Sequence, residues 1–186
     1  TQNRLPKNSA SKVDKNDTTQ QTEVRLKELE LSASENPIQN PTTVEEFEKF
    51  VDFYGLKFKM PKGYEIIKVK ENRDLFYSFA VINADSSMEI RYTIQTLKPY
   101  MLAYEKSLKD ENSMMIPANN IYRGNVKANV LNMTGGDMYD IGAFPTQAVK
   151  KEFNADAGGS CFFKFNSEFG KGYEFGQFVY LHKDDT

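Results

Sequence analysis

The fold is decided by one stretch, FPTQAVKKEFNADAGGSCFFKFNSEFGKGYEFGQFVYLH, which covers residues 144–182. Its first part predicts a helix that begins at Pro145-Thr146, because proline near the first helical position loses only an amide that has no intrahelical partner. Val149 and Phe153 lie four residues apart and share one face of this helix. Asn154 ends it, since asparagine tolerates left-handed backbone dihedrals.

Two aromatic strands are predicted after this helix, Cys161–Phe165 and Tyr173–His182. The second strand is apolar on both faces, with Tyr173, Phe175, Val179 and Leu181 on one side and Phe178 and Tyr180 on the other. Such strands are normally covered on both faces. We therefore expect this pair near the middle of a sheet that is flanked by helices.

An amphipathic helix is predicted to begin after Thr43, which is a good N-cap residue. Glu45 and Glu46 favour its first turn through the helix dipole, and Gly55 ends it. The apolar residues Val44, Phe47, Phe50, Val51 and Tyr54 follow at three- and four-residue spacing. Strands are predicted next at 56–60 and 64–69, on either side of a turn at 61–63.

A hairpin is predicted from strands 75–82 and 88–97, joined across residues 83–87. In its second strand Glu89 and Arg91 alternate with apolar residues, which predicts one solvated face. A helix is expected from Pro99, closing at residues 110–112, or reaching Met115 in a longer form. Val126, Ala128 and Val130 alternate with polar residues, which predicts another strand.

The strands come in adjacent antiparallel pairs and do not alternate with helices, so we assign the α+β class: an antiparallel β-sheet flanked by helices. The domain covers residues 44–186. Residues 1–43 have too few apolar side chains to bury, so we expect a polar, flexible tether. Residues 24–31 are predicted to form either a short strand or one or two helical turns.

Composition excludes some classes of protein. The chain has 24 basic and 26 acidic side chains and a net charge of −2, which does not favour binding to nucleic acid. No apolar run approaches the roughly 18–20 residues of a transmembrane segment. The single cysteine, Cys161, fits a buried apolar position. The chain starts without methionine and 182–186 resembles a turn into a further strand, so we expect a processed chain that continues.

The segment YGLKFKMPKGY, residues 54–64, resembles the opening of PsbP-like and Mog-type domains. The later order of hairpin, helix, strand, helix and closing strand pair is similar as well. The resemblance implies an α/β/α sandwich. It also implies a family of accessory and binding modules, including a photosystem subunit and a Ran-binding protein, more than a family of catalysts.

We identify no catalytic residue, cofactor site or metal site in the sequence. His182 is the only histidine and is expected at an exposed strand end, although Asp184 and Asp185 lie close in sequence. Gly135-Gly136-Asp137 lacks the lysine and the spacing of a phosphate-binding loop. The candidate ligand-binding residues are Arg91 on the polar face of the hairpin, Tyr122 and Arg123 in an expected loop, and the carboxylates Asp137 and Asp140.

Three functions follow from these observations. The first is a non-enzymatic accessory or binding module for an unknown protein or small ligand. We expect it to be exported to the periplasm or cell surface and held at a membrane by its N-terminal tether. The second is a hydrolase that uses carboxylates around residues 135–140. The third is a protein-interaction domain that pairs through an exposed edge strand, together with the apolar patch Met114–Ile116.

Overall fold

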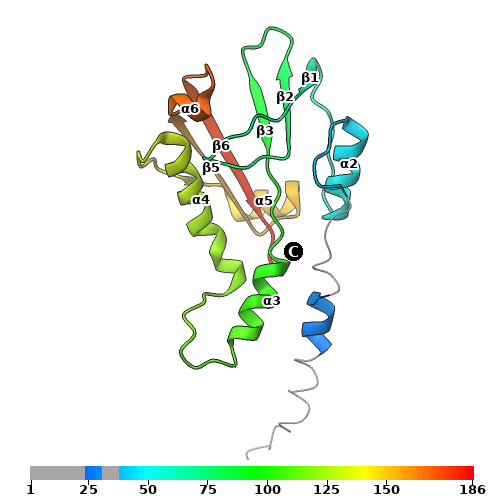
Figure 1. Ribbon diagram of the computed structural model, residues 1–186, viewed down its shortest axis with the longest axis vertical. Helices are drawn as coiled ribbons and strands as arrows, with labels where there is room; N and C mark the ends of the chain where they lie inside the picture. The colour runs from blue at the N-terminus through cyan, green and yellow to red at the C-terminus, as the bar shows by residue number, and fades with distance from the viewer. Residues whose placement is uncertain (1–23, 31–37) are drawn as a thin grey trace, which may run out of the picture.

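The computed structural model describes residues 24–30 and 38–186. Figure 1 shows an α+β arrangement, which confirms the predicted class. After a helix at 24–30, the order is α2 (Val44–Phe53), β1 (Tyr64–Ile67), β2 (Phe79–Asn83), β3 (Glu89–Tyr92), α3 (Lys98–Ser107), α4 (Ala118–Thr134), β4 (Gly142–Ala143), α5 (Thr146–Phe153), β5 (Ala157–Lys164), α6 (Ser167–Gly170) and β6 (Phe175–His182).

Helix α2 covers one face of the antiparallel sheet β1-β2-β3. Thr43 and Glu46 form a reciprocal capping box that fixes its first turn. Phe47 is 1% exposed and stacks on Phe79 of β2, with ring centroids 4.0 Å apart. The apolar stripe read from the sequence therefore packs where its spacing predicts.

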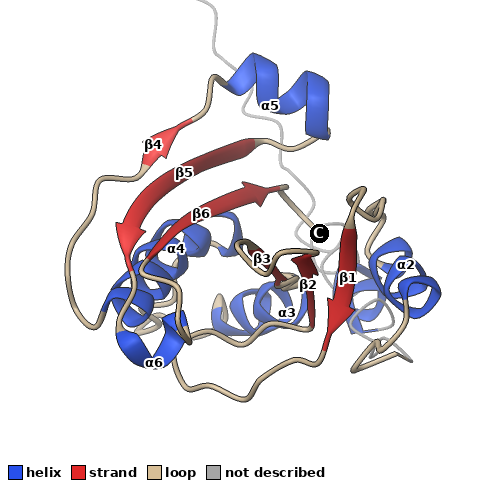
Figure 2. Cartoon of the chain, turned by 90° about the horizontal axis from the view of Figure 1, so that it is seen from above, coloured by secondary structure: helices blue, strands red, loops and turns tan. Residues whose placement is uncertain are grey.

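The strands β4, β5 and β6 form a second antiparallel sheet, with β5 in the middle (Figure 2). This corrects the expectation that the aromatic strand pair lies inside one larger sheet. β6 is an edge strand, and only one of its faces is covered. Phe175, Val179 and Leu181 are 68%, 53% and 47% exposed on the other face.

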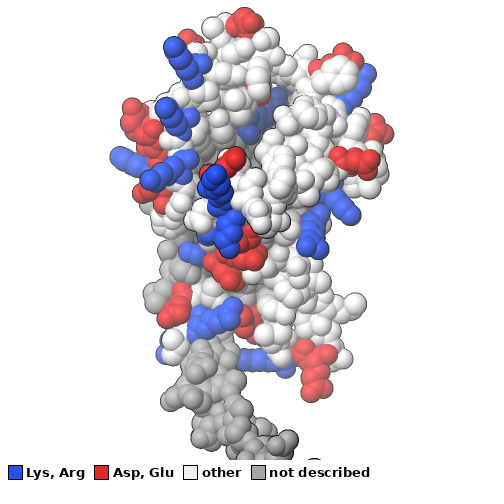
Figure 3. Space-filling model, turned by 180° about the vertical axis from the view of Figure 1, so that it is seen from behind, with Lys and Arg blue, Asp and Glu red and all other residues white. Residues whose placement is uncertain are grey.

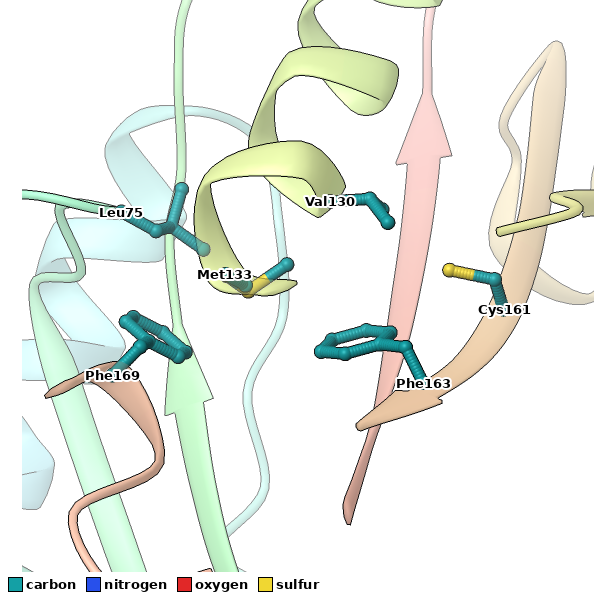
Figure 4. Close-up of a cluster of buried hydrophobic side chains, with 6 residues drawn as sticks. All are labelled: Leu75, Val130, Met133, Cys161, Phe163 and Phe169. Carbon is teal, nitrogen blue, oxygen red and sulfur yellow. The ribbon is translucent and has the colours of Figure 1, made fainter. Parts of the chain in front are cut away.

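Residues 126–130, predicted as a strand, belong to the long helix α4. Val126 and Val130 lie four apart and therefore share a helical face as readily as they share a strand face. Val130 and Met133 from α4 pack with Cys161 and Phe163 of β5 in a core that Leu75 and Phe169 complete (Figure 4).

Other predicted boundaries also change. Residues 56–60, predicted as a strand, belong to no helix or strand and to neither sheet among the described residues. The hairpin strands are shorter than predicted, and α3 ends at Ser107. The face of β3 that carries Glu89 and Arg91 is not solvated, because these side chains are only 3% and 12% exposed.

Part of the segment predicted as a tether contacts the domain. The helix at 24–30 confirms the helical alternative for this region, and Leu29 packs with Met101 and Ala118. Arg25 forms an ion pair with Glu105 at 3.3 Å. The rest of the tether prediction falls on residues 1–23 and 31–37, outside the described part. None of the helices in that part is both long and apolar enough to cross a bilayer.

Candidate functional site

Arg91 links strand β3 of the first sheet to helix α6, which precedes strand β6 of the second sheet. Its Nε donates to Glu89 Oε1 at 2.6 Å, and its Nη1 donates to the Phe169 carbonyl oxygen at 2.7 Å. The guanidinium also lies over the rings of Tyr77 and Phe169, at 5.3 Å and 4.5 Å from the centroids. The side chain that the sequence offers as an anion ligand is therefore engaged by protein groups on several sides.

Tyr122 and Arg123 lie on α4 and not in a loop, which corrects that prediction. Tyr122 stacks on His182 with ring centroids 4.0 Å apart and an interplanar angle of 16°. Arg123 Nε donates to the Tyr122 hydroxyl at 3.4 Å, and this bond raises the pKa of Arg123. Tyr180 completes the group, with its ring centroid 6.0 Å from that of Tyr122.

His182 is 7% exposed, so it is not the exposed strand end that we expected. Its Nε2 lies 2.9 Å from Asp184 Oδ1. In the described ranges, no serine, threonine or cysteine side chain is hydrogen-bonded to it, and no group of three His, Cys, Asp or Glu residues is arranged to hold a metal ion. The group formed by Tyr122, His182 and Asp184 packs the end of β6 against α4. In the described residues it places no nucleophilic side chain next to the His182 imidazole.

Asp137 and Asp140 are exposed and do not share a pocket. An open pocket of about 590 Å³ is lined by other residues: Asp74, Leu131, Asn132, Gly135, Gly136, Asn166, Ser167 and Glu168. The Gly135 and Gly136 amides already donate to the carbonyls of Asn132 and Leu131. These amides are therefore not available to an oxyanion, and neither predicted carboxylate faces the pocket.

The sequence interpretation expected an exposed edge strand in one of its hypotheses but placed β6 inside the sheet, whereas β6 is a strand with a free edge. Phe165 N donates to Glu174 O, which fixes the alternation of the β5–β6 ladder. The backbone N–H and C=O groups that point toward β5 are those of Gly176, Phe178, Tyr180 and His182. The groups that point away from β5 belong to the alternate residues Phe175, Gln177, Val179 and Leu181. In the described part of the chain, these outward groups have no backbone partner.

The side chains of those outward-turned residues add an apolar surface. Phe175, Val179 and Leu181 share the outer face of the sheet with Phe162 of β5, which is 73% exposed. The sequence contains a signal for this exposure, because the polar residues Ser160, Lys164 and Gln177 fall on the same face by alternation. Such an uncovered patch is typical of an interaction surface.

On the face drawn in Figure 3, charge does not single out one region. Figure 3 shows basic and acidic side chains interspersed over the face that it draws. In the loop between α3 and α4, Met114 is 94% exposed and Ile116 is 50% exposed, so the Met114–Ile116 patch does face solvent.

No family model, curated protein or solved structure matches the chain.

Proposed function

We propose that the chain is a non-enzymatic binding module that takes up an extended segment of a partner protein along the free edge of β6. One observation carries the proposal: in Phe175, Val179 and Leu181, an unpaired backbone and an exposed apolar side chain belong to the same residues. An added strand gains main-chain hydrogen bonds from the edge and specificity from the side chains that alternate along it.

The unpaired backbone groups of β6 also need an explanation, because an open sheet edge on a single chain can pair with other chains. Natural sheets protect such edges with charged side chains, proline, bulges or a covering element, because an unprotected edge pairs with other chains. The four outward-turned residues of β6 include no charged residue and no proline. This absence of protection supports a role in pairing, as the edge-strand hypothesis from the sequence expects.

The expected setting of this module is part of the same proposal. The polar composition of residues 1–43 supports export and attachment at a membrane surface, where an accessory module of the PsbP-like or Mog-type kind would meet its partner. Fractionation of the native host tests the location. Recovery of the protein from the cytoplasm would contradict export and would leave the binding proposal untouched.

Selection from a library of displayed random peptides tests the binding proposal without knowledge of the partner. The chain is used as bait, and Val179→Pro is the counter-selection bait because proline removes one amide donor from the free edge. Val179→Thr is the matched control, since it keeps the amide and the β-branched shape. We expect enriched peptides with alternating apolar residues that bind wild type and Val179→Thr but not Val179→Pro. Peptides that bind all three equally would contradict the proposal.

A further inference from the structure

The strand β3 has a free edge as well as β6. Asn83 N donates to Met88 O, which fixes the alternation of the β2–β3 ladder. Ile90 and Tyr92 therefore face β2 with their backbone groups, and Glu89 and Arg91 turn theirs away. Among the described residues, no backbone hydrogen bond joins β3 to β6. The two sheets thus each end in an unpaired strand.

These two free strands run in the same direction. The Tyr173 hydroxyl, just before β6, donates to the Ser86 carbonyl in the turn before β3 at 2.9 Å. At the other end Leu97 N, beyond β3, donates to Thr186 O, beyond β6, at 2.8 Å. Both segments therefore start at one pair of contacts and finish at the other, so a single strand antiparallel to β3 is antiparallel to β6 too.

The inner faces of the two sheets lie on the same side of the molecule. Phe169 lies against the Arg91 guanidinium and belongs to the same core as Cys161 and Phe163, beneath α4. The face of Arg91 on β3 and the inner face of β5–β6 are therefore one side of the molecule. Ile90 and Tyr92 lie on the opposite side, which is the side of Val179 and Phe162.

We propose that the partner segment enters between β3 and β6, antiparallel to both, and joins the two three-stranded sheets into one continuous antiparallel sheet. This inference rests on the proposed function and adds the position, direction and chemistry of the bound segment. Its outer side chains are apolar, because they meet Val179 and Tyr92. The side chains facing α4 are small and uncharged, because the Arg91–Glu89 pair already satisfies both charges on that side.

A buried hydroxyl supports this assignment. Thr93 Oγ1, directly after β3 and on the Arg91 side by alternation, is buried and has no hydrogen-bond partner in the described part of the chain. Buried polar groups are normally paired, and an unpaired one needs an explanation. A serine or threonine on the inner side of the entering strand supplies the missing partner.

The occupant is one extended segment and not the β6 edge of a second copy. The contacts of Tyr173 with Ser86 and of Thr186 with Leu97 keep the β2–β3 hairpin alongside both ends of β6. A single strand needs only about 4.8 Å on each side of its backbone. A second copy would bring its own paired sheet to the same edge, where β3 already lies.

The test uses a peptide of alternating valine and threonine with a lysine at each end, added at millimolar concentration to the isotope-labelled chain. Amide hydrogen exchange is followed by NMR. We expect exchange to slow at least tenfold at Val179 and Leu181 of β6 and at Glu89 and Arg91 of β3 together. Val179→Pro should abolish the protection on both strands, and Val179→Thr should retain it.

A spin label on the amino end of the same peptide tests direction. Antiparallel pairing places this end near Leu97 and Thr186, so their signals should broaden while those of Ser86 and Tyr173 stay sharp. Protection of β6 alone would overturn the bridging inference and leave the proposed function standing. Protection of neither edge would overturn both. A chain that sediments as a dimer through β6 without peptide would overturn the single-strand inference.

Discussion

The guanidinium of Arg91 donates to the backbone carbonyl of Phe169 and lies 4.5 Å from the centroid of the same ring. The two residues are 78 positions apart, so this contact links β3 to the short helix α6 in front of β6. Glu89 supplies the counter-charge from two residues away. The arrangement aligns the two sheets whose free edges face the proposed partner segment.

Replacing Arg91 should destabilise the fold more than a surface charge would. Its side chain is 12% exposed and that of Glu89 is 3% exposed, so Arg91→Met leaves a buried carboxylate without its partner. Removing one member of such a pair costs about 3–5 kcal/mol in the free energy of unfolding. Urea unfolding measures the change. Lys164→Met is the control, because its ion pair with Glu174 is exposed and should contribute less than about 1 kcal/mol.

Substitutions of Phe47 and Phe162 should have different effects, because Phe47 lies in the core and Phe162 lies on the proposed binding surface. Phe47→Ala should cost about 3–5 kcal/mol, because this ring is 1% exposed and stacks on Phe79. Phe162→Ala should change stability by no more than about 0.5 kcal/mol, because its ring is 73% exposed. Phe162→Ala should nevertheless weaken binding of the alternating peptide. Equal peptide affinity in wild type and Phe162→Ala would show that the exposed face is not part of the interface.

Glycines at two positions give opposite predictions for the same substitution. A Cβ at Gly159 would meet the carbonyl oxygen of Gly142 on β4 and the ring of Tyr180, 2.8 Å away. Gly159→Ala should therefore cost about 1–3 kcal/mol, since backbone atoms must shift. Gly124→Ala should stabilise by about 0.5–1 kcal/mol, because the position is an open site inside α4. Thermal unfolding of both variants against wild type checks the two signs.

Cys161 makes stability depend on alkaline pH. Burial raises the pKa of its thiol, so the folded chain keeps the proton when the unfolded chain has lost it. The free energy of unfolding should therefore be constant well below the unfolded thiol pKa of about 8.5. It should fall as pH rises from there through the folded pKa. Burial raises the pKa values of Tyr92 and Tyr180 as well, which adds a loss of the same sign near pH 10.

Urea midpoints measured across the alkaline range check this slope. Cys161→Ala is the matched variant: it should be less stable overall but should lose less stability between about pH 8 and pH 9.5. Thiol labelling gives a second measurement, because the native thiol should react only after unfolding. Rapid labelling of the native chain at about pH 8 would contradict a buried, protonated Cys161.

The sequence by itself determined the elements whose signals are local. Thr43 with Glu46 and Pro145 with Asn154 mark the ends of α2 and α5, because caps act on backbone groups within one turn. The antiparallel hairpin and the two strands β5 and β6 also follow from alternation along short segments. The α+β class is a consequence of their order along the chain.

The tertiary structure alone decided which apolar faces are covered and which edges stay open. Val126 and Val130 fit a strand or a helix equally until α4 packs on Cys161 and Phe163, so local spacing cannot choose between them. Glu89 and Arg91 look solvated in sequence, yet their side chains are only 3% and 12% exposed, and the Phe169 ring lies against the Arg91 guanidinium. Val179 looks buried in sequence, yet its side chain is 53% exposed on the outer face of β6. Burial and strand pairing depend on segments many residues apart, and no local pattern along the chain records which of those segments meet.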